Sequence, residues 1–155
     1  MSISETLRKP VVPVFASLTE ALSPYTEPAL RAATGLFLVP HGAQKLFGWF
    51  GGYGVEATGQ FFAQKLGLPA SLALAAGMIE FFGGLALACG LFTRPIALLV
   101  AGMMAFAVVL VHLPAGFFWT DGGYEYPLLW GILALIVAIR GGGRYSVDAL
   151  IGREI

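Results

Sequence analysis

Two long stretches of the chain carry almost no charge, and they limit the folds that the sequence can adopt. Between Lys65 and Arg94 the only charged residue is Glu80, and between Arg94 and Asp121 there is none. Each stretch can hold the roughly 20 apolar residues that an α-helix needs to cross a bilayer. The whole chain is 57% hydrophobic and 12% charged, with a mean hydropathy of +0.80, whereas soluble domains are about 25% charged. The sequence therefore predicts an all-α membrane protein.

Four transmembrane helices account for the apolar segments. Two of them, over 70–91 and 95–113, fill the charge-free stretches and end at proline-containing turns. A third, over 28–47, contains Pro40, which cannot donate a backbone hydrogen bond and therefore predicts a kink. The fourth, over 126–139, has 14 uncharged residues, about 21 Å of helix, and must borrow length at either end. We expect a four-transmembrane-helix bundle.

The basic residues are distributed unevenly around these spans. With four spans both termini lie on one side, and the other side keeps only Lys45 and Lys65. Because short cytoplasmic segments are enriched in Lys and Arg, both termini of this multi-pass protein are expected in the cytoplasm. The basic residues on the terminal side are Arg8, Lys9, Arg31, Arg94, Arg140, Arg144 and Arg153.

The two ends of the chain predict small additions to the bundle. Residues 1–27 form an N-terminal extension with an interfacial amphipathic helix, because apolar residues recur there at helical spacing: Val11, Val14, Phe15, Leu18 and Leu22. A cleaved signal peptide is the competing interpretation, which two early prolines disfavour. The transmembrane domain covers 28–140. In the cytoplasmic tail, 141–155, Ser146 can cap a short helix.

Glu80 is the most informative polar residue because it lies near the middle of its span. A charged side chain at that depth costs roughly 2.5–3.5 kcal/mol, so it must face protein or water and find a partner or a proton. Gly77, Gly83 and Gly84 lie three and four residues away, and their size allows another backbone to come close to the same face. We therefore expect Glu80 to face the interior of the bundle.

Polar residues on the other spans fall at similar or outer levels. His41, Gln44 and Lys45 share one helix face, and His112 and Glu125 lie near the outer surface, so all four spans could build one polar pocket. The structural alternatives are that His41 satisfies the carbonyl freed by Pro40, that Gln44 bridges helices and that Lys45 snorkels. Arg94, at a turn on the cytoplasmic side, suits a membrane anchor or lipid head-group contact.

Several motifs together resemble those of the DoxX family of small bacterial membrane proteins. Arg31 and Gly35 precede HGAQKLFGWFGG (41–52), and EFFGGLALACGLFTRP (80–95), GFFWTDGGYEYPLL (116–129) and GGGRYSVD (141–148) come after it in order. The resemblance implies a four-helix membrane fold and a link to quinone-coupled oxidoreductases, through the similar small subunit of thiosulfate:quinone oxidoreductase. It also implies that the polar positions of the family are Arg31, His41, Lys45, Glu80, Arg94, His112, Glu125, Arg144 and Asp148.

Three functions from different classes are compatible with these residues. In the first, the chain is a subunit of a membrane oxidoreductase. Here His41, Glu80 and His112 relay protons or line a quinone pocket, and Gln44, Lys45, Arg94 and Glu125 assist binding. In the second, it is a non-catalytic structural or assembly subunit of a respiratory or photosynthetic complex, docking through its glycine faces and N-terminal helix. In the third, His41 and His112 ligate a haem, which requires both histidines to face one another.

The sequence supplies no redox centre of its own. It has one cysteine, Cys89, which excludes an internal disulfide or a paired-cysteine redox motif, and two histidines, too few for a structural zinc site without carboxylates. We therefore expect no metal and no cofactor bound by this chain alone, disfavour haem, and leave quinone as the redox molecule it could contact. Partners are expected to be membrane lipid and further membrane or peripheral subunits. The balanced charge, nine basic against nine acidic residues, argues against nucleic acid.

Overall fold

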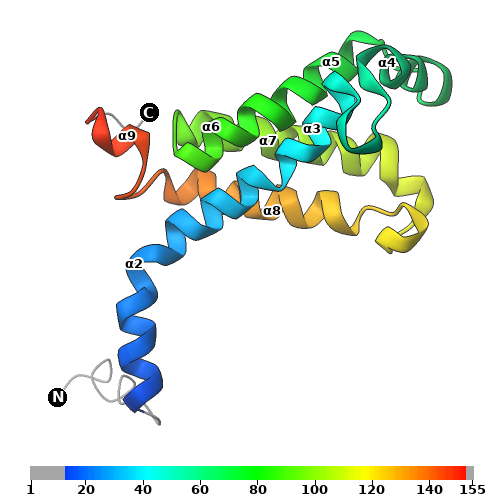
Figure 1. The fold of residues 1–155 in the computed structure, drawn as a ribbon. Helices are drawn as coiled ribbons and strands as arrows, with labels where there is room; N and C mark the ends of the chain where they lie inside the picture. Colours follow the sequence, from blue (N-terminus) through cyan, green and yellow to red (C-terminus); the bar gives the residue numbers. More distant parts are fainter. Residues whose placement is uncertain (1–12, 153–155) are drawn as a thin grey trace.

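The computed structural model describes residues 13–152, which are helical with no strand in that range (Figure 1). Most helices are joined by short turns, and η2 and η3 are π-helical whereas η1, η4 and η5 are 3-10 turns. In chain order the elements are α2 (Pro13–Leu36), α3 (Leu38–Phe47), η1 (Trp49–Gly51), α4 (Gly54–Lys65), α5 (Ser71–Met78), η2 (Ile79–Gly83), α6 (Gly84–Cys89), α7 (Thr93–Ala107), η3 (Val108–His112), η4 (Leu113–Ala115), η5 (Trp119–Asp121), α8 (Glu125–Arg140) and α9 (Val147–Leu150).

Within residues 13–152, two continuous helices are long and apolar enough to cross a membrane. Elements α5, η2 and α6 form Ser71–Cys89, with a hydropathy of 1.9, and α7, η3 and η4 form Thr93–Ala115, with a hydropathy of 2.6. Only 33% and 22% of these helices are buried inside the protein, so most of their apolar side chains lie on its surface. A soluble protein would hide surface of this kind, whereas lipid solvates it. The predicted helices over 70–91 and 95–113 are confirmed.

The first predicted span is divided into two helices. Helix α2 ends at Leu36 and α3 begins at Leu38, with a turn at Phe37. Pro40 lies in the first turn of α3 and has no N–H to donate to the carbonyl of Leu36. The helix break that Pro40 predicts is therefore present. It lies at Phe37, just before the residues of the predicted polar pocket.

The helices pack in pairs around small residues. Helix α7 lies along α8, α2 packs against α6, and α3 packs against α5 and η2. Two buried apolar clusters hold them together: Leu38, Val100, Ala101, Met104 and Ala134 in one, and Leu87, Ala97, Val137 and Ala138 in the other. Trp130 of α8 donates its Nε1 proton to the Thr34 carbonyl of α2 at 3.1 Å. Helix α8 has 16 residues, about 24 Å of helix, slightly less than the bilayer core.

The first part of α2 leaves the bundle and projects to one side (Figure 1). Its apolar residues Val14, Phe15, Leu18 and Leu22 are exposed, while Val11 of the same predicted pattern lies outside the described residues. The helix continues into the first predicted span through Pro24 and Pro28. The chain end after α8 returns to the same end of the bundle, where α9 lies near the end of α6 (Figure 1).

Helix α4 was not foreseen from the sequence. It has 12 residues, from Gly54 to Lys65, and packs against α3 and α5. Glu56 in its first turn and Lys65 in its last turn match the direction of the helix dipole. The glycine-rich segment 48–53 before it forms a turn, with one 3-10 turn at Trp49–Gly51.

Candidate functional site

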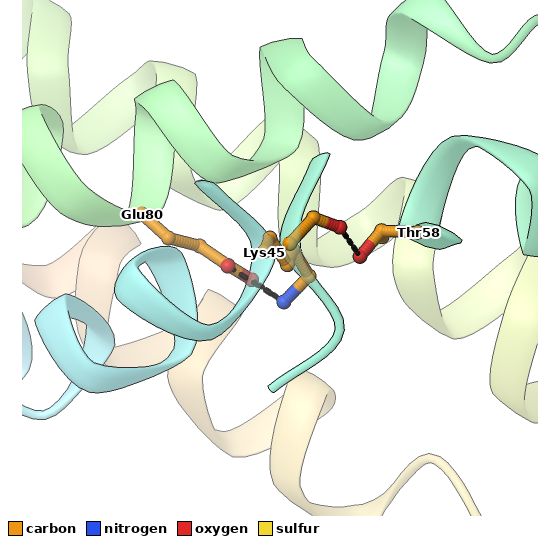
Figure 2. Close-up of polar contacts among 4 residues, drawn as sticks. Lys45, Thr58 and Glu80 are labelled. Atoms are coloured by element: carbon orange, nitrogen blue, oxygen red, sulfur yellow. Dashed lines mark hydrogen bonds and ion pairs between the residues drawn. The ribbon is translucent and has the colours of Figure 1, made fainter. Parts of the chain in front are cut away.

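An ion pair between Lys45 and Glu80 lies inside the helical bundle. The Lys45 ammonium donates to both carboxylate oxygens of Glu80, with Nζ 2.6 Å from Oε2 and 2.9 Å from Oε1. Figure 2 shows the two side chains pointing toward one another from α3 and η2. Glu80 is 7% exposed, whereas the Lys45 side chain is 27% exposed. The carboxylate is therefore enclosed, and the lysine connects it to the surface.

Glycines on both helices allow this contact. A Cβ atom at Gly42 would lie 2.4 Å from the backbone nitrogen of Phe81, and one at Gly77 would lie 2.8 Å from Leu46 and 3.3 Å from Lys45 Cβ. No larger residue fits at Gly42 without moving the backbone, and at Gly77 a larger residue would displace the Leu46 side chain. Close approach of α3 to α5 and η2 is what lets a lysine side chain reach the carboxylate, as small residues do in membrane helix packing.

Glu80 lies in a π-helical turn, Ile79–Gly83, between two α-helical segments. A π turn inserts one extra residue into the helix and rotates the segment after it relative to the segment before it, and such turns are frequent at functional sites. A second π turn, Val108–His112, interrupts the other charge-free helix. Both long apolar helices thus change their winding next to a predicted polar residue.

The glycine-rich turn 48–53 and helix α4 flank the pair. Gly52 lies against Gln44, since a Cβ atom there would be 2.4 Å from Gln44 Cα. The side-chain amide of Gln44 donates to the Phe50 carbonyl at 3.2 Å. Phe50 has a left-handed backbone, with φ 53° and ψ 34°, a conformation that costs free energy in a non-glycine residue. Thr58 of α4 donates to the Gly54 carbonyl at 2.7 Å (Figure 2).

Aromatic rings extend from the same two helices. Phe47 of α3 meets Phe81 of η2 edge to face, with ring centroids 5.2 Å apart, and lies 4.9 Å from the ring of Trp49. Phe47 follows Lys45 by two residues, and Phe81 follows Glu80 directly. These rings therefore form an aromatic cluster on the same two elements that carry the charged pair, and their faces offer planar surfaces.

The other predicted site residues have separate contacts. His41 is exposed, and its side chain makes no hydrogen bond within residues 13–152. His112 Nδ1 lies 2.7 Å from the Gly122 carbonyl oxygen, and Glu125 Oε2 accepts from the Trp119 backbone N–H at 3.2 Å. Arg94 donates to the carbonyls of Ala138 and Ile139 at the end of α8. The structure therefore joins Lys45 and Glu80, and it ties His112, Glu125 and Arg94 to nearby backbone.

A second polar cluster lies at the end of the bundle that carries the C-terminal segment. We call it the clasp, and define it by its four buried side chains, Arg31, Thr93, Ser146 and Asp148. Arg31 donates from Nη1 to the carbonyls of Leu87 (2.9 Å) and Ala88 (2.7 Å), and from Nη2 to that of Tyr145 (2.7 Å). One guanidinium thus fastens α2 to α6 and to the tail.

Asp148 caps α7 from a distant part of the chain. Its carboxylate accepts from the backbone N–H groups of Phe92 (2.8 Å) and Thr93 (2.9 Å) and from the Thr93 hydroxyl (2.7 Å). Phe92, the residue before α7, offers no capping side chain, so Asp148 supplies the negative group that a helix N-terminus favours. Burial alone would raise the pKa of Asp148, but these hydrogen bonds and the charge of Arg31 outweigh it, so the pKa lies below its ordinary value.

The clasp requires a glycine at position 90, where α6 ends beside Arg31 and Ser146. Gly90 has φ +73°, and a Cβ atom there would lie 2.5 Å from both Arg31 Nη1 and Ser146 Cβ. The Gly90 carbonyl accepts from the Asp148 N–H at 2.9 Å. Ser146 caps α9 by accepting from the Ala149 N–H, as the sequence predicts. Sequence reasoning had no account of how Arg31 and Asp148 are used, although both stand among the polar positions that the resemblance implies.

Metal binding has no visible basis in the part of the chain that the structure describes. Among residues 13–152, no group of three or more His, Cys, Asp or Glu side chains is placed to hold a metal ion. The chemistry that the site offers is instead that of a carboxylate, an ammonium group and aromatic rings. These groups can hold a proton and contact a planar molecule.

The fold and the site define an all-helical membrane protein with an ion pair inside its apolar helices. Comparison with known families narrows the class, because residues 28–113 match the model of the DoxX family. The chain belongs to the DoxX family. The match covers the paired residues Lys45 and Glu80 and ends just beyond His112.

Two known proteins are similar to most of the chain. The chain is 31% identical over 122 residues to "Putative oxidoreductase CatD" of Bacillus subtilis (strain 168), covering 79% of this chain and 84% of that protein. It is 32% identical over 132 residues to an "Uncharacterized protein" of Haemophilus influenzae (strain ATCC 51907 / DSM 11121 / KW20 / Rd), covering 83% and 92%. No solved structure matches the chain.

Proposed function

We propose that the chain is a membrane subunit of a quinone-linked oxidoreductase, and that the pair of Lys45 and Glu80 is its proton-carrying site. Membership of the family and the printed name of the Bacillus subtilis relative support an association with oxidoreductases. The observation that carries the proposal is the ion pair itself, 2.6 Å long and enclosed in an apolar bundle. Membrane carboxylates of this kind are costly and usually serve transport of protons or ligands.

In the proposed reaction this chain supplies the protons and a partner subunit supplies the electrons. A quinone becomes a quinol by taking up two electrons and two protons. The electrons come from a redox subunit of the flavoprotein or iron–sulfur class, because this chain offers no redox centre. Glu80 passes protons to the quinone oxygen and regains them through the exposed face of Lys45. While Glu80 is ionised, Lys45 balances its charge, and the rings of Phe47 and Phe81 offer a wall for the quinone head group.

His41 and the remaining polar residues have supporting roles in this proposal. His41 lies one helical turn before Lys45, on the same face of α3, and is exposed, so it can exchange protons with the surroundings. Gln44 fixes the glycine-rich turn over the site through its bond to Phe50. His112 and Glu125 order the loop between α7 and α8 through their backbone contacts, and Arg94 anchors the end of α8.

We also propose the four-span arrangement in a bacterial inner membrane, with both termini in the cytoplasm. The pairing of α7 with α8 and of α2 with α6 makes α8 and the segment from α2 through α3 suitable as the remaining two spans. Arg31, Arg94, Arg140 and Arg144 gather at the end of the bundle where the tail is held, in keeping with the rule that the arginine-rich side is cytoplasmic.

The test is to purify the tagged chain from its native membranes in a gentle detergent and to identify what accompanies it. The proposal expects a redox subunit and electron transfer to quinone in the same membranes, both lost when the gene is deleted and both restored by the wild-type chain. If Glu80→Leu restores electron transfer, the ion pair does not have the proposed role. If deletion of the gene leaves every redox activity of the membranes unchanged, the chain is not an oxidoreductase subunit.

A non-catalytic assembly subunit is the alternative function. The glycine faces on which that interpretation rested are used inside the chain, because Gly35 lies against Gly84 and Gly42 lies against Gly77, each too close for a Cβ atom. The exposed apolar residues on the first part of α2 remain as a docking surface for it. This second function would be favoured if the complex fails to assemble when the gene is deleted, but assembles with full electron transfer when the chain carries Glu80→Leu.

A further inference from the structure

A cleft between α2 and α8 is not used by the ion pair or by the proposed redox function. It has a volume of about 200 Å³ and is lined by four residues of α2 between Thr26 and Arg31 and by four residues at the end of α8 between Ile136 and Gly141. We propose that this cleft, which we call the arginine cleft, binds the phosphate head group and first chain segment of an anionic phospholipid. The site lies at the arginine-rich end of the bundle, where the helices leave the membrane.

The polarity of the arginine cleft changes along its depth. Glu27 and Arg140 lie on its outer part, and Leu30, Ile136 and Val137 lie about one helical turn deeper. An amphiphile can therefore place its head at the rim and its chain against the apolar wall, as lipids do in basic pockets between membrane helices. A free inorganic anion would gain nothing from the apolar part of the cleft.

The charge of the lining is positive. Arg31 and Arg140 contribute two guanidinium groups against the one carboxylate of Glu27. Arg31 is 3% exposed and hydrogen-bonds only to backbone carbonyls in the described residues, with its Nε atom left without a partner there. Arg31 makes no direct ion pair within the described residues, but the Asp148 carboxylate of the clasp interacts with it electrostatically. An anion in the cleft is therefore attracted by Arg140 and by the part of the Arg31 charge that Asp148 leaves uncompensated.

Arg140 is available to a phosphate although it contacts Glu27. The ion pair joins Arg140 Nη2 to Glu27 Oε1, and the two side chains are 61% and 37% exposed. Exposed pairs of this kind contribute little stability, and a guanidinium has five N–H donors in a fork that suits phosphate. A phosphate can thus bind the free donors of Arg140, and Glu27 acts as the group that competes with it.

The test measures lipid binding to the full-length chain in a neutral detergent, followed as the shift of its thermal unfolding midpoint with added lipid. Dioleoyl phosphatidylglycerol is the probe, dioleoyl phosphatidylcholine carries the same chains without net charge, and inorganic phosphate supplies the anion without chains. The proposal expects saturable stabilisation by phosphatidylglycerol, about fivefold weaker binding of phosphatidylcholine, which corresponds to about 1 kcal/mol for one arginine contact, and no shift with phosphate at equal concentration.

Variants locate the site. Arg140→Gln should weaken binding of phosphatidylglycerol about fivefold, and Glu27→Gln should strengthen it because the competing carboxylate is gone. Arg144→Gln is the matched control, since Arg144 is exposed at the same end and does not line the cleft. The proposal is overturned if Arg140→Gln and Arg144→Gln have equal effects, if both lipids bind equally, or if inorganic phosphate reproduces the stabilisation.

Discussion

The pair of Lys45 and Glu80 and the clasp use charged residues in opposite ways. In the clasp, Arg31 bonds to three carbonyls and Asp148 to two N–H groups and a hydroxyl, and all four side chains are buried. In the pair, each charged group has mainly the other as its partner, and Lys45 is partly open to the surroundings. A network in which each charged group has several fixed partners holds its geometry, whereas a pair with few other partners can exchange a proton or admit a ligand.

The comparison predicts where stability is concentrated. Replacing Arg31 by Gln removes the guanidinium that joins α2, α6 and the tail, and takes its hydrogen bonds away from three backbone carbonyls. Three charge-assisted bonds are each worth roughly 1.5–3 kcal/mol and are not additive, so we expect the free energy of unfolding to fall by about 3 kcal/mol or more. Unfolding in detergent, followed by circular dichroism, measures it. A fall below about 1 kcal/mol would mean that the clasp does not hold the bundle end.

Replacing Asp148 by Asn has the next largest effect, and it depends on pH. The pKa of Asp148 lies below its ordinary value of 3.8 in the folded chain, so the carboxylate stabilises the fold above that value, and this contribution is lost as pH falls through the folded pKa. We expect Asp148→Asn to cost about 2 kcal/mol near pH 7. The difference from wild type should shrink in unfolding measurements below about pH 4. A difference that stays constant with pH would contradict this role.

Lys45 tests whether the pair stabilises the fold. Lys45→Met leaves Glu80 enclosed without its partner, and we expect a loss of about 2 kcal/mol. The double variant Lys45→Met with Glu80→Leu should recover most of that loss, because replacing both charges by apolar groups removes the desolvation cost. Unfolding midpoints of the single and double variants give the coupling free energy. An additive double variant would mean that the two side chains do not interact.

His112 is expected to have the smallest effect. Its ring contacts the Gly122 carbonyl in a largely exposed loop, so His112→Ala should change the free energy of unfolding by about 0.5 kcal/mol. The purified chain is also expected to be colourless before and after this substitution, since we expect no haem on it. An absorption band near that of haem in the wild type, lost in the variant, would contradict both expectations.

The sequence predicts local features well and distant contacts poorly. The two charge-free stretches define their helices, Pro40 marks the break before α3, and Ser146 marks the cap of α9, because each signal acts within a few residues. Glu80 could be expected to need a partner, but the choice of Lys45 depends on how α3 packs against η2. Arg31 meets the Tyr145 carbonyl across 114 residues, and no local periodicity encodes such a contact.

Helix α4 and the segment between α7 and α8 also depend on contacts that the sequence does not predict. The sequence gives Gly54–Lys65 only a weak helical pattern, and its packing against α3 and α5 stabilises it more than its propensity does. The polar pocket built from all four spans stays a prediction. His112 ends η3 and Glu125 begins α8, and their contacts with the backbone of the segment between them depend on turns whose geometry could not be read from residue spacing.

The measurement that tests the account most directly compares Glu80→Gln with Asp148→Asn in native membranes. For each variant, quinone-dependent electron transfer per folded chain is measured beside the unfolding midpoint of the purified protein. We expect Glu80→Gln to keep a midpoint near that of the wild type and to lose the activity, whereas Asp148→Asn should lower the midpoint and keep the activity of the chains that fold. Full activity in Glu80→Gln, or loss of activity in folded Asp148→Asn, would contradict the division between a functional pair and a structural clasp.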